Sequence, residues 1–280
     1  MALQDRMLGQ ISVPYEAQFV QTRFGVTHVI HAGGNQDPPV FLLHGMNASA
    51  GMWVPQINEL AKTHSIYAAD MPASMGKSTP NRIPREGSAY ADWLTDVMDA
   101  VQVEAASFIG ISFGGWLALK LSTVAPQRMI SAVLMSSAGF TPQGSRLMFK
   151  LTPYLFIMPF LSFDKRAELF LKVMALPGHI PSADEKELFG LLLSEVKHDR
   201  RAPEPLPDEA LKQLTCPTAV YFGEYEAAFN KDKALARARK LLPNLVDSQI
   251  VSGVSHGMNG DDAPGINGML LRFLAQYHRG

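Results

Sequence analysis

The chain has 280 residues, a formal net charge of -1 at pH 7, and 47% hydrophobic residues. This length fits one large α/β domain with an insertion, and the near-neutral charge offers nothing that attracts nucleic acid or an anionic membrane. Charged residues make up only 18% of the chain, against roughly 25% in typical soluble domains, which indicates a large core or an apolar cavity.

The single cysteine, Cys216, cannot form an internal disulfide, and the usual zinc sites need several Cys or His at close spacing. We therefore expect neither a metal nor a cofactor. The first residues include Asp5 and Arg6 and lack the apolar stretch of a secretory signal, so we expect a cytoplasmic protein. The most apolar segment, residues 151–163, is too short to span a bilayer and contains two prolines.

Short apolar runs alternate with longer segments of helical period along the chain. This alternation predicts a mostly parallel sheet with helices on both faces. Eight strands are expected, at residues 17–22, 26–31, 40–43, 65–69, 106–109, 130–135, 218–222 and 246–251. The expected helices span residues 52–62, 88–101, 115–124, 232–242 and 264–278.

The alternation stops between Phe140 and Leu214, where helical stretches at 166–175 and 185–196 occur without a clear strand. We interpret residues 140–214 as a helical cap inserted into a core made of residues 1–139 and 215–280. The prolines at its end predict an extended return to the sheet at Pro203, Pro205 and Pro207.

The run Gly110-Ile111-Ser112-Phe113-Gly114 has the pattern of a nucleophile elbow, in which a serine sits on a strained strand-to-helix turn. An apolar run precedes it and a helix-prone stretch follows it, as the elbow requires. A second match, Gly253-Val254-Ser255-His256-Gly257, runs into the loop-like composition of residues 258–262. Ser112 is therefore the candidate nucleophile and Ser255 a loop residue.

A serine hydroxyl needs a neighbouring base, and histidine has the pKa that suits this role near neutrality. In the elbow architecture the order is Ser, then acid, then His, with the base on a loop after the last strand. His256 meets that condition. The other histidines precede Ser112, lie in the expected cap or lie at the end of the chain: His28, His31, His44, His64, His179, His198 and His278.

The acid that orients the histidine should follow the penultimate strand. Glu226 is the candidate, because it stands three residues after Gly223, which closes the predicted strand. Glu224 is the rival and Asp232 a more distant one. All of them also fit a simpler interpretation, in which they are solvated loop carboxylates.

Negative charge on a substrate carbonyl oxygen needs fixed donors, which this architecture supplies as two backbone N-H groups. One is expected from Phe113, directly after the candidate nucleophile. The other is expected from Met46, because the predicted strand at residues 40–43 runs into His44-Gly45 and glycine lets the backbone approach. These two amides are the candidate oxyanion hole.

With these motifs the chain resembles the α/β-hydrolase carboxylesterases, and it is similar to the naproxen-type esterases over nearly its whole length. The resemblance rests on the elbow and on Thr22-Arg23-Phe24-Gly25, Leu42-Leu43-His44-Gly45, Tyr90-Ala91-Asp92-Trp93-Leu94 and Gly223-Glu224-Tyr225-Glu226. It implies the α/β-hydrolase fold and cleavage of small to medium hydrophobic esters. The chain departs from the family's usual Gly-His in having Ser255 before His256.

Other interpretations remain open at this stage. A cofactor-free peroxidase or a carbon-carbon bond hydrolase would have the same triad, and so would a ligand receptor that retained it. Met75-Gly76-Lys77-Ser78 resembles the end of a phosphate-binding loop, but Met71 replaces its first glycine. Asp70, at the end of a predicted strand, is expected to fix the following turn by accepting backbone hydrogen bonds.

The expected cap begins with a strongly apolar stretch that could roof an apolar substrate pocket, pack on the core, or form a homodimer surface or a lipid contact. The expected partner is a small-molecule ester. The apolar residues of this stretch are Leu147, Met148, Phe149, Leu151, Tyr154, Phe156, Ile157, Met158, Phe160 and Phe163.

Overall fold

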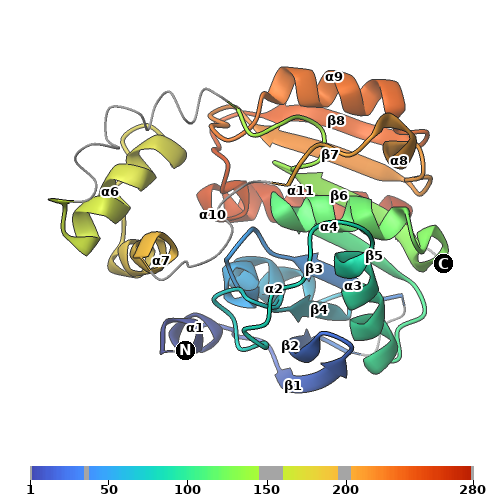
Figure 1. Cartoon of the computed structure of the whole chain (residues 1–280), viewed down its shortest axis with the longest axis horizontal. Coiled ribbons are helices and arrows are strands. Elements are labelled where there is room, and N and C mark those ends of the chain that lie inside the picture. Colours follow the sequence, from blue (N-terminus) through green and yellow to red (C-terminus); the bar gives the residue numbers. More distant parts are fainter. Residues whose placement is uncertain (1, 35–37, 145–159, 195–202, 279–280) are drawn as a thin grey trace.

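A computed structural model of the chain describes residues 2–34, 38–144, 160–194 and 203–278. Its centre is an eight-stranded sheet with the order β1-β2-β4-β3-β5-β6-β7-β8 (Figure 1). The strands are β1 (Tyr15–Thr22), β2 (Gly25–Ala32), β3 (Val40–Leu43), β4 (Ile66–Ala69), β5 (Ala106–Ile111), β6 (Met129–Met135), β7 (Thr218–Gly223) and β8 (Leu245–Val251).

The sheet is parallel from β4 to β8 and antiparallel at its beginning. The β1–β2 hairpin pairs with β4 through β2, and both of these pairings are antiparallel. Every residue of β3, β5 and β7 is buried, as expected of central parallel strands that are covered on both faces. The predicted eight-stranded, mostly parallel sheet is confirmed.

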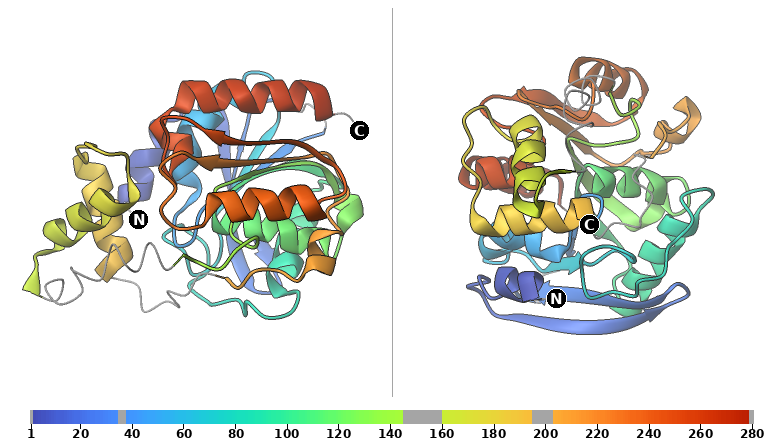
Figure 2. Two further views of the ribbon diagram at one scale, coloured as in Figure 1. Left: turned by 90° about the horizontal axis from the view of Figure 1, so that it is seen from above. Right: turned by 60° about the vertical axis from the view of Figure 1, so that its left-hand side comes forward.

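Helices cover both faces of the sheet, and the strands send alternate side chains to each side. Phe41 and Leu43 join one core with Trp93 and Leu117, whereas Leu42 points to the opposite core. The first core is covered by α3 (Ala89–Ala100), α4 (Phe113–Ser122), α8 (Asp208–Leu211) and α9 (Lys231–Leu241). The second is covered by α1 (Ala2–Leu8), α2 (Val54–Leu60), α10 (Met258–Asp261) and α11 (Ala263–Tyr277). Figure 2 shows α9 and α11 on opposite sides of the sheet.

Four helical features differ from the sequence predictions. The start of the chain forms α1, and residues 258–261 form the short helix α10 rather than a loop. The helix after the elbow begins at Phe113, two residues earlier than expected. Finally, the helix expected from residue 52 begins as a 3-10 turn, η1 (Ala50–Trp53), before α2. A further 3-10 turn, η2 (Pro126–Arg128), precedes β6.

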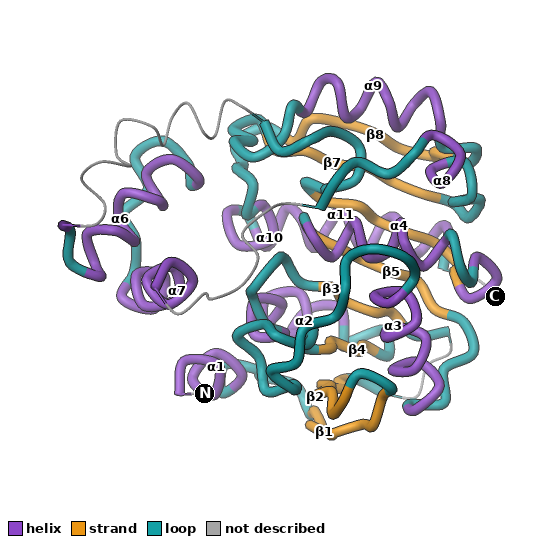
Figure 3. Tube along the Cα trace, viewed as in Figure 1, coloured by secondary structure: helices purple, strands orange, loops and turns teal. Residues whose placement is uncertain are grey.

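Between β6 and β7, the described residues contain α6 (Phe163–Met174), α7 (Ala183–Ser194) and α8 but no strand (Figure 3). Helices α6 and α7 pack on each other, with the rings of Phe170 and Phe189 5.7 Å apart and an ion pair between Lys186 and Glu168. They lie to one side of the sheet (Figure 1). The apolar cap residues 147–158 of the prediction lie outside the described residues.

Helix α1 connects this helical pair to the core. The Arg6 guanidinium forms ion pairs with Asp184 and Glu187 of α7, and the Gln4 side-chain amide donates to Asp70 at the end of β4. Residues 203–207 return to the sheet without helix or strand structure, and the Leu206 amide donates to the Gly139 carbonyl. Among the described residues, no helix combines the length and apolar character needed to cross a bilayer.

Candidate active site

Ser112 occupies the bend between β5 and α4 with φ 54° and ψ -111°. A non-glycine residue with positive φ is strained, and such strain is characteristic of a nucleophile elbow. The flanking glycines make the bend feasible, because a Cβ at Gly114 would collide with the Leu43 carbonyl and one at Gly110 with the backbone of Gly114. The predicted strand, turn and helix around Ser112 are therefore present.

The Ser112 backbone is held on both sides of the bend. Its amide donates to the Met135 carbonyl at 2.9 Å, and its carbonyl accepts from the Ala138 amide at 3.1 Å and the Trp116 amide at 3.2 Å. These bonds link the bend to the end of β6 and to the first turn of α4. The conformation of Ser112 is thus determined by the surrounding structure, which offsets its intrinsic strain.

His256 and Glu226 lie in direct contact although 30 residues separate them. The Nδ1 of His256 is 2.9 Å from both Oε1 and Oε2 of the Glu226 carboxylate. Glu226 follows β7 and His256 follows β8, so parallel strands bring them to the same edge of the sheet as Ser112, which follows β5. Because Nδ1 donates to the carboxylate, Nε2 is left with its lone pair to accept a proton.

The Glu226 side chain is fully buried, and its Oε1 also accepts from the backbone amides of Ala228 at 2.6 Å and Phe229 at 3.2 Å. Burial alone would raise the pKa of Glu226, but the His256 imidazole and the Ala228 amide outweigh it and hold the pKa below its usual range. Burial correspondingly acts to lower the pKa of His256, but the charge and hydrogen bond of Glu226 raise it above its ordinary value.

The rival carboxylates have different neighbours. Glu224 accepts from the Ser252 hydroxyl at 2.8 Å and from the Gly253 amide at 2.9 Å, and these bonds lower the pKa of its exposed carboxyl. Asp232 lies in the first turn of α9. Of the three carboxylates considered, Glu226 is the one in contact with His256.

Ser255 is buried beside His256, but its hydroxyl is committed to another partner. Its Oγ donates to Asp261 Oδ2 at 2.6 Å, and its backbone amide reaches the same oxygen at 2.6 Å. Ser255 therefore joins the loop after β8 to α10, which fits its predicted place on a loop.

The His44-Gly45-Met46 turn follows β3 beside the elbow. An ideal Cβ on Gly45 would lie 3.9 Å from the Ser112 Cβ. Burial lowers the pKa of His44, whose Nδ1 lies 2.7 Å from the Gly45 carbonyl while its Nε2 accepts from the Met71 amide at 2.9 Å. A neutral imidazole that donates from Nδ1 satisfies both bonds. His44 thus connects the Gly45-Met46 turn to the loop after β4.

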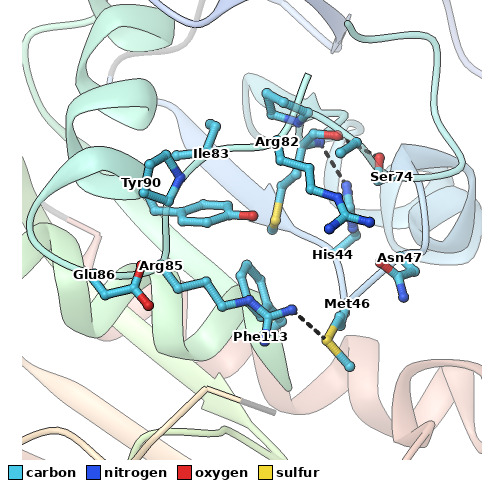
Figure 4. A pocket seen from close by; sticks show the side chains of 14 residues that line it. His44, Met46, Asn47, Ser74, Arg82, Ile83, Arg85, Glu86, Tyr90 and Phe113 are labelled. Atoms are coloured by element: carbon cyan, nitrogen blue, oxygen red, sulfur yellow. Dashed lines mark hydrogen bonds between the residues drawn. The ribbon is translucent and has the colours of Figure 1, made fainter. Parts of the chain in front are cut away.

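A cavity of about 340 Å³ opens beside this turn (Figure 4). Met46 and Phe113, the two candidate oxyanion donors, both contribute to its wall. Other lining residues come from the loop after β4 and the start of α3. The described residues that line it are His44, Met46, Asn47, Met71, Pro72, Ala73, Ser74, Arg82, Ile83, Pro84, Arg85, Glu86, Tyr90 and Phe113.

The charged residues of this cavity, Arg82, Arg85 and Glu86, were not among the sequence-based candidates. They lie in the irregular loop between β4 and α3, where neither helical nor strand periodicity marks which side chains face inward. The sequence contains one weak signal for these charged cavity residues, because two arginines flank Ile83-Pro84 in a chain with few charges.

Asp70 is fully buried at the start of that loop and fixes its path. Its carboxylate accepts from the backbone amides of Ala50 at 2.7 Å and Lys77 at 2.9 Å, and from the His28 ring and the Gln4 side chain. A Cβ at Gly76 would collide with the Asp70 carboxylate. The predicted turn-fixing role of Asp70 is confirmed. Segment 75–78, which resembles the end of a phosphate-binding loop, packs around the Asp70 carboxylate.

Comparisons with known proteins agree with this architecture. The family model described as alpha/beta hydrolase fold matches residues 38–174. Carboxylesterase YbfK of Bacillus subtilis is 28% identical over 96% of this chain and 91% of its own, and its crystal structure gives a TM-score of 0.84. The crystal structure of naproxen esterase from Bacillus subtilis gives a TM-score of 0.85 at 26% identity, covering 98% of this chain and 96% of that one. This chain therefore has the α/β-hydrolase fold and is similar over nearly its whole length to the Bacillus carboxylesterases.

Proposed function

We propose that this protein is a serine carboxylesterase that cleaves small to medium esters through an acyl-enzyme intermediate, with Ser112 as nucleophile, His256 as base and Glu226 as the orienting acid. The observation that carries the proposal is the contact between His256 Nδ1 and the buried Glu226 carboxylate, at the sheet edge where strained Ser112 follows β5. Its relatives YbfK and naproxen esterase are carboxylesterases.

In the first half-reaction, Ser112 Oγ attacks the ester carbonyl carbon while His256 Nε2 takes its proton. The negative charge that develops on the carbonyl oxygen is met by the amides of Met46 and Phe113. The Phe113 amide suits this role because it is the first residue of α4, where N-H groups lack an intrahelical acceptor. His256 then gives its proton to the departing alcohol.

In the second half-reaction, water donates a proton to His256 and its oxygen attacks the acyl carbon. The bond between that carbon and Ser112 Oγ then breaks while His256 returns the proton to Oγ, and the acid leaves. Throughout the cycle Glu226 stays ionised, since its lowered pKa keeps it charged at neutral pH, and it stabilises the imidazolium that forms in each half-reaction.

We further propose that residues 140–214 act as a cap on a core formed by residues 1–139 and 215–280. The mutual packing of α6 and α7, and the ion pairs of α7 to Arg6 of α1, support a separate helical unit attached at the side of the sheet. A cap of this kind shields the reacting ester from bulk water.

Hydrolysis of 4-nitrophenyl butanoate, followed by release of 4-nitrophenolate, tests the proposed function. The wild-type chain should turn this ester over, and Ser112→Ala should not do so above the uncatalysed rate by more than a residual amount. A wild-type chain without esterase activity, or a Ser112→Ala variant as active as wild type, would refute the proposal.

A further inference from the structure

The cavity beside the oxyanion turn combines an apolar wall with two arginines. Met46, Tyr90 and Phe113 supply apolar surface, whereas Arg82 and Arg85 reach it from the loop before α3 (Figure 4). A volume of about 340 Å³ lies at the small end of the range for sites that bind small molecules. The cavity therefore fits a short chain with a polar group at one end.

Arg85 contacts the side chains of both residues whose amides are assigned to the oxyanion hole. Its Cζ lies 5.6 Å from the centre of the Phe113 ring, and its Nη2 lies 3.4 Å from Met46 Sδ. These two contacts place the half-buried guanidinium at the wall of the cavity. A fixed guanidinium is a good partner for a carboxylate, because it presents parallel donors in a rigid plane.

The described residues of the cavity lining carry more positive than negative charge. Among them, Arg82 and Arg85 contribute two positive charges and Glu86 one negative charge, which gives these residues a net charge of +1. His44 adds no charge, since burial lowers its pKa. In Figure 4 the guanidinium groups of Arg82 and Arg85 extend toward the turn at His44 and Met46, and Glu86 lies farther from that turn. The net attraction near the oxyanion turn is therefore for an anion.

We propose that the preferred substrates are esters that carry a carboxylate at the far end of a short apolar chain, with Arg85 as the main determinant of this specificity and Arg82 as a second cation. The inference rests on the proposed esterase function and adds its substrate class. The reaction is ordinary ester hydrolysis: water adds across the acyl carbon to oxygen bond, which breaks to give an alcohol and an acid, and one proton is released.

Two pairs of esters of matched chain length test this specificity. Monomethyl adipate and methyl hexanoate differ by a carboxylate on the acyl side, and 6-acetoxyhexanoate and hexyl acetate differ by one on the alcohol side. Acid release is followed by titration at pH 8. The wild-type chain should give a higher kcat/KM for the charged ester in at least one pair, which also identifies the side that faces Arg85.

Arg85→Gln should lower the ratio of kcat/KM for charged over neutral ester by about tenfold, and Arg85→Lys should retain part of the preference. Glu86→Gln should raise the ratio. Lys120→Gln is the matched control, because Lys120 lies 5.8 Å over the Trp116 ring, away from the cavity lining, and it should leave the ratio within about twofold.

Activity toward the neutral esters distinguishes a failure of the proposed anion specificity from a failure of the proposed esterase function. Neutral-ester hydrolysis that depends on Ser112, without preference for either charged ester, would overturn the anion specificity and leave the esterase function standing. An Arg85→Gln variant that loses charged and neutral activity in equal proportion would likewise overturn it, since Arg85 would then act on the oxyanion turn in general. No turnover of any of the four esters would overturn both.

Discussion

His256 Nδ1 lies 2.9 Å from each oxygen of the Glu226 carboxylate, which is fully buried and also held by two backbone amides. This arrangement fixes the imidazole ring and directs Nε2 away from the carboxylate. A buried carboxylate without an ionic partner would be costly, so each member of the pair stabilises the other. Contact with His256 distinguishes the buried carboxylate of Glu226 from the exposed carboxylate of Glu224 in the same loop.

Replacement of Glu226 should therefore harm turnover far more than replacement of Glu224. Glu226→Gln removes the charge that stabilises the imidazolium, and we expect kcat to fall by about two to four orders of magnitude. Glu224→Gln, at an exposed carboxylate bonded to Ser252 and Gly253, should change kcat less than about threefold. Steady-state hydrolysis of one aryl ester by both variants makes the comparison, and the opposite ranking would transfer the role to Glu224.

The same pair predicts the pH dependence of the reaction. Only neutral His256 can accept the Ser112 proton, and Glu226 raises the pKa of His256 above its ordinary value. The kcat/KM should therefore fall as the pH drops through a midpoint above about 6.5. Glu226→Gln should shift this midpoint to lower pH. A pH profile with its acid limb below pH 6 in the wild-type chain would contradict the assignment.

The elbow glycines should tolerate no side chain. A Cβ at Gly114 would collide with the Leu43 and His44 carbonyl oxygens, which are backbone atoms of β3 and the following turn. Gly114→Ala should destabilise the fold by about 2–4 kcal/mol or displace Ser112 and abolish activity. Gly260→Ala is the control, since nothing lies within 4 Å of its added Cβ. Urea unfolding and esterase assays would detect either effect, and a fully active, fully stable Gly114→Ala variant would be inconsistent with the tight packing.

Asp70 should be more important for stability than any exposed acid. Asp70→Asn leaves buried donors from Ala50, Lys77 and His28 with a poorer acceptor, and we expect a loss of about 3 kcal/mol. Asp99→Asn breaks a surface ion pair with Arg128 and should cost less than about 1 kcal/mol. Chemical denaturation of both variants gives the comparison, and equal losses would contradict the role of Asp70.

The pH dependence of stability has a defined sign at Asp70. Burial acts to raise its pKa, but His28, His44 and the backbone amides outweigh burial and hold the folded-state pKa below the unfolded value. The contribution of Asp70 is therefore present above the unfolded pKa near 3.8 and is lost as the pH falls through the lower, folded-state pKa. Asp70→Asn should flatten this part of the stability profile.

The sequence predicted the sheet well because its strands are continuous apolar runs bounded by turn residues. Strand β3 has the predicted bounds, and β5 and β7 extend theirs by one or two residues. The predicted fold and the predicted resemblance to carboxylesterases are confirmed by the comparisons. Helix α10 was wrongly predicted as a loop because Asn259, Gly260 and Asp261 have poor helix propensity, which packing of Met258 into the core overrides.

The sequence could predict only those residues of the candidate site whose order along the chain is characteristic of the fold. The order Ser112, Glu226, His256 follows from strand topology, so a sequence pattern can suggest it, and these roles stay proposals. The charged wall of the cavity was not predictable, because Arg82 and Arg85 lie in an irregular loop whose path depends on the distant contacts of Asp70. The helical or strand periodicity of a short segment contains no information about such long-range contacts.

The proposed mechanism requires that Ser112, among all serines of the chain, is an activated nucleophile. Treatment with a fluorophosphonate, followed by proteolysis and mass spectrometry, tests it most directly. We expect a single phosphonylated serine at position 112, with labelling lost in His256→Ala and retained in Ser255→Ala. Labelling at Ser255, or no labelling of a folded chain, would contradict it.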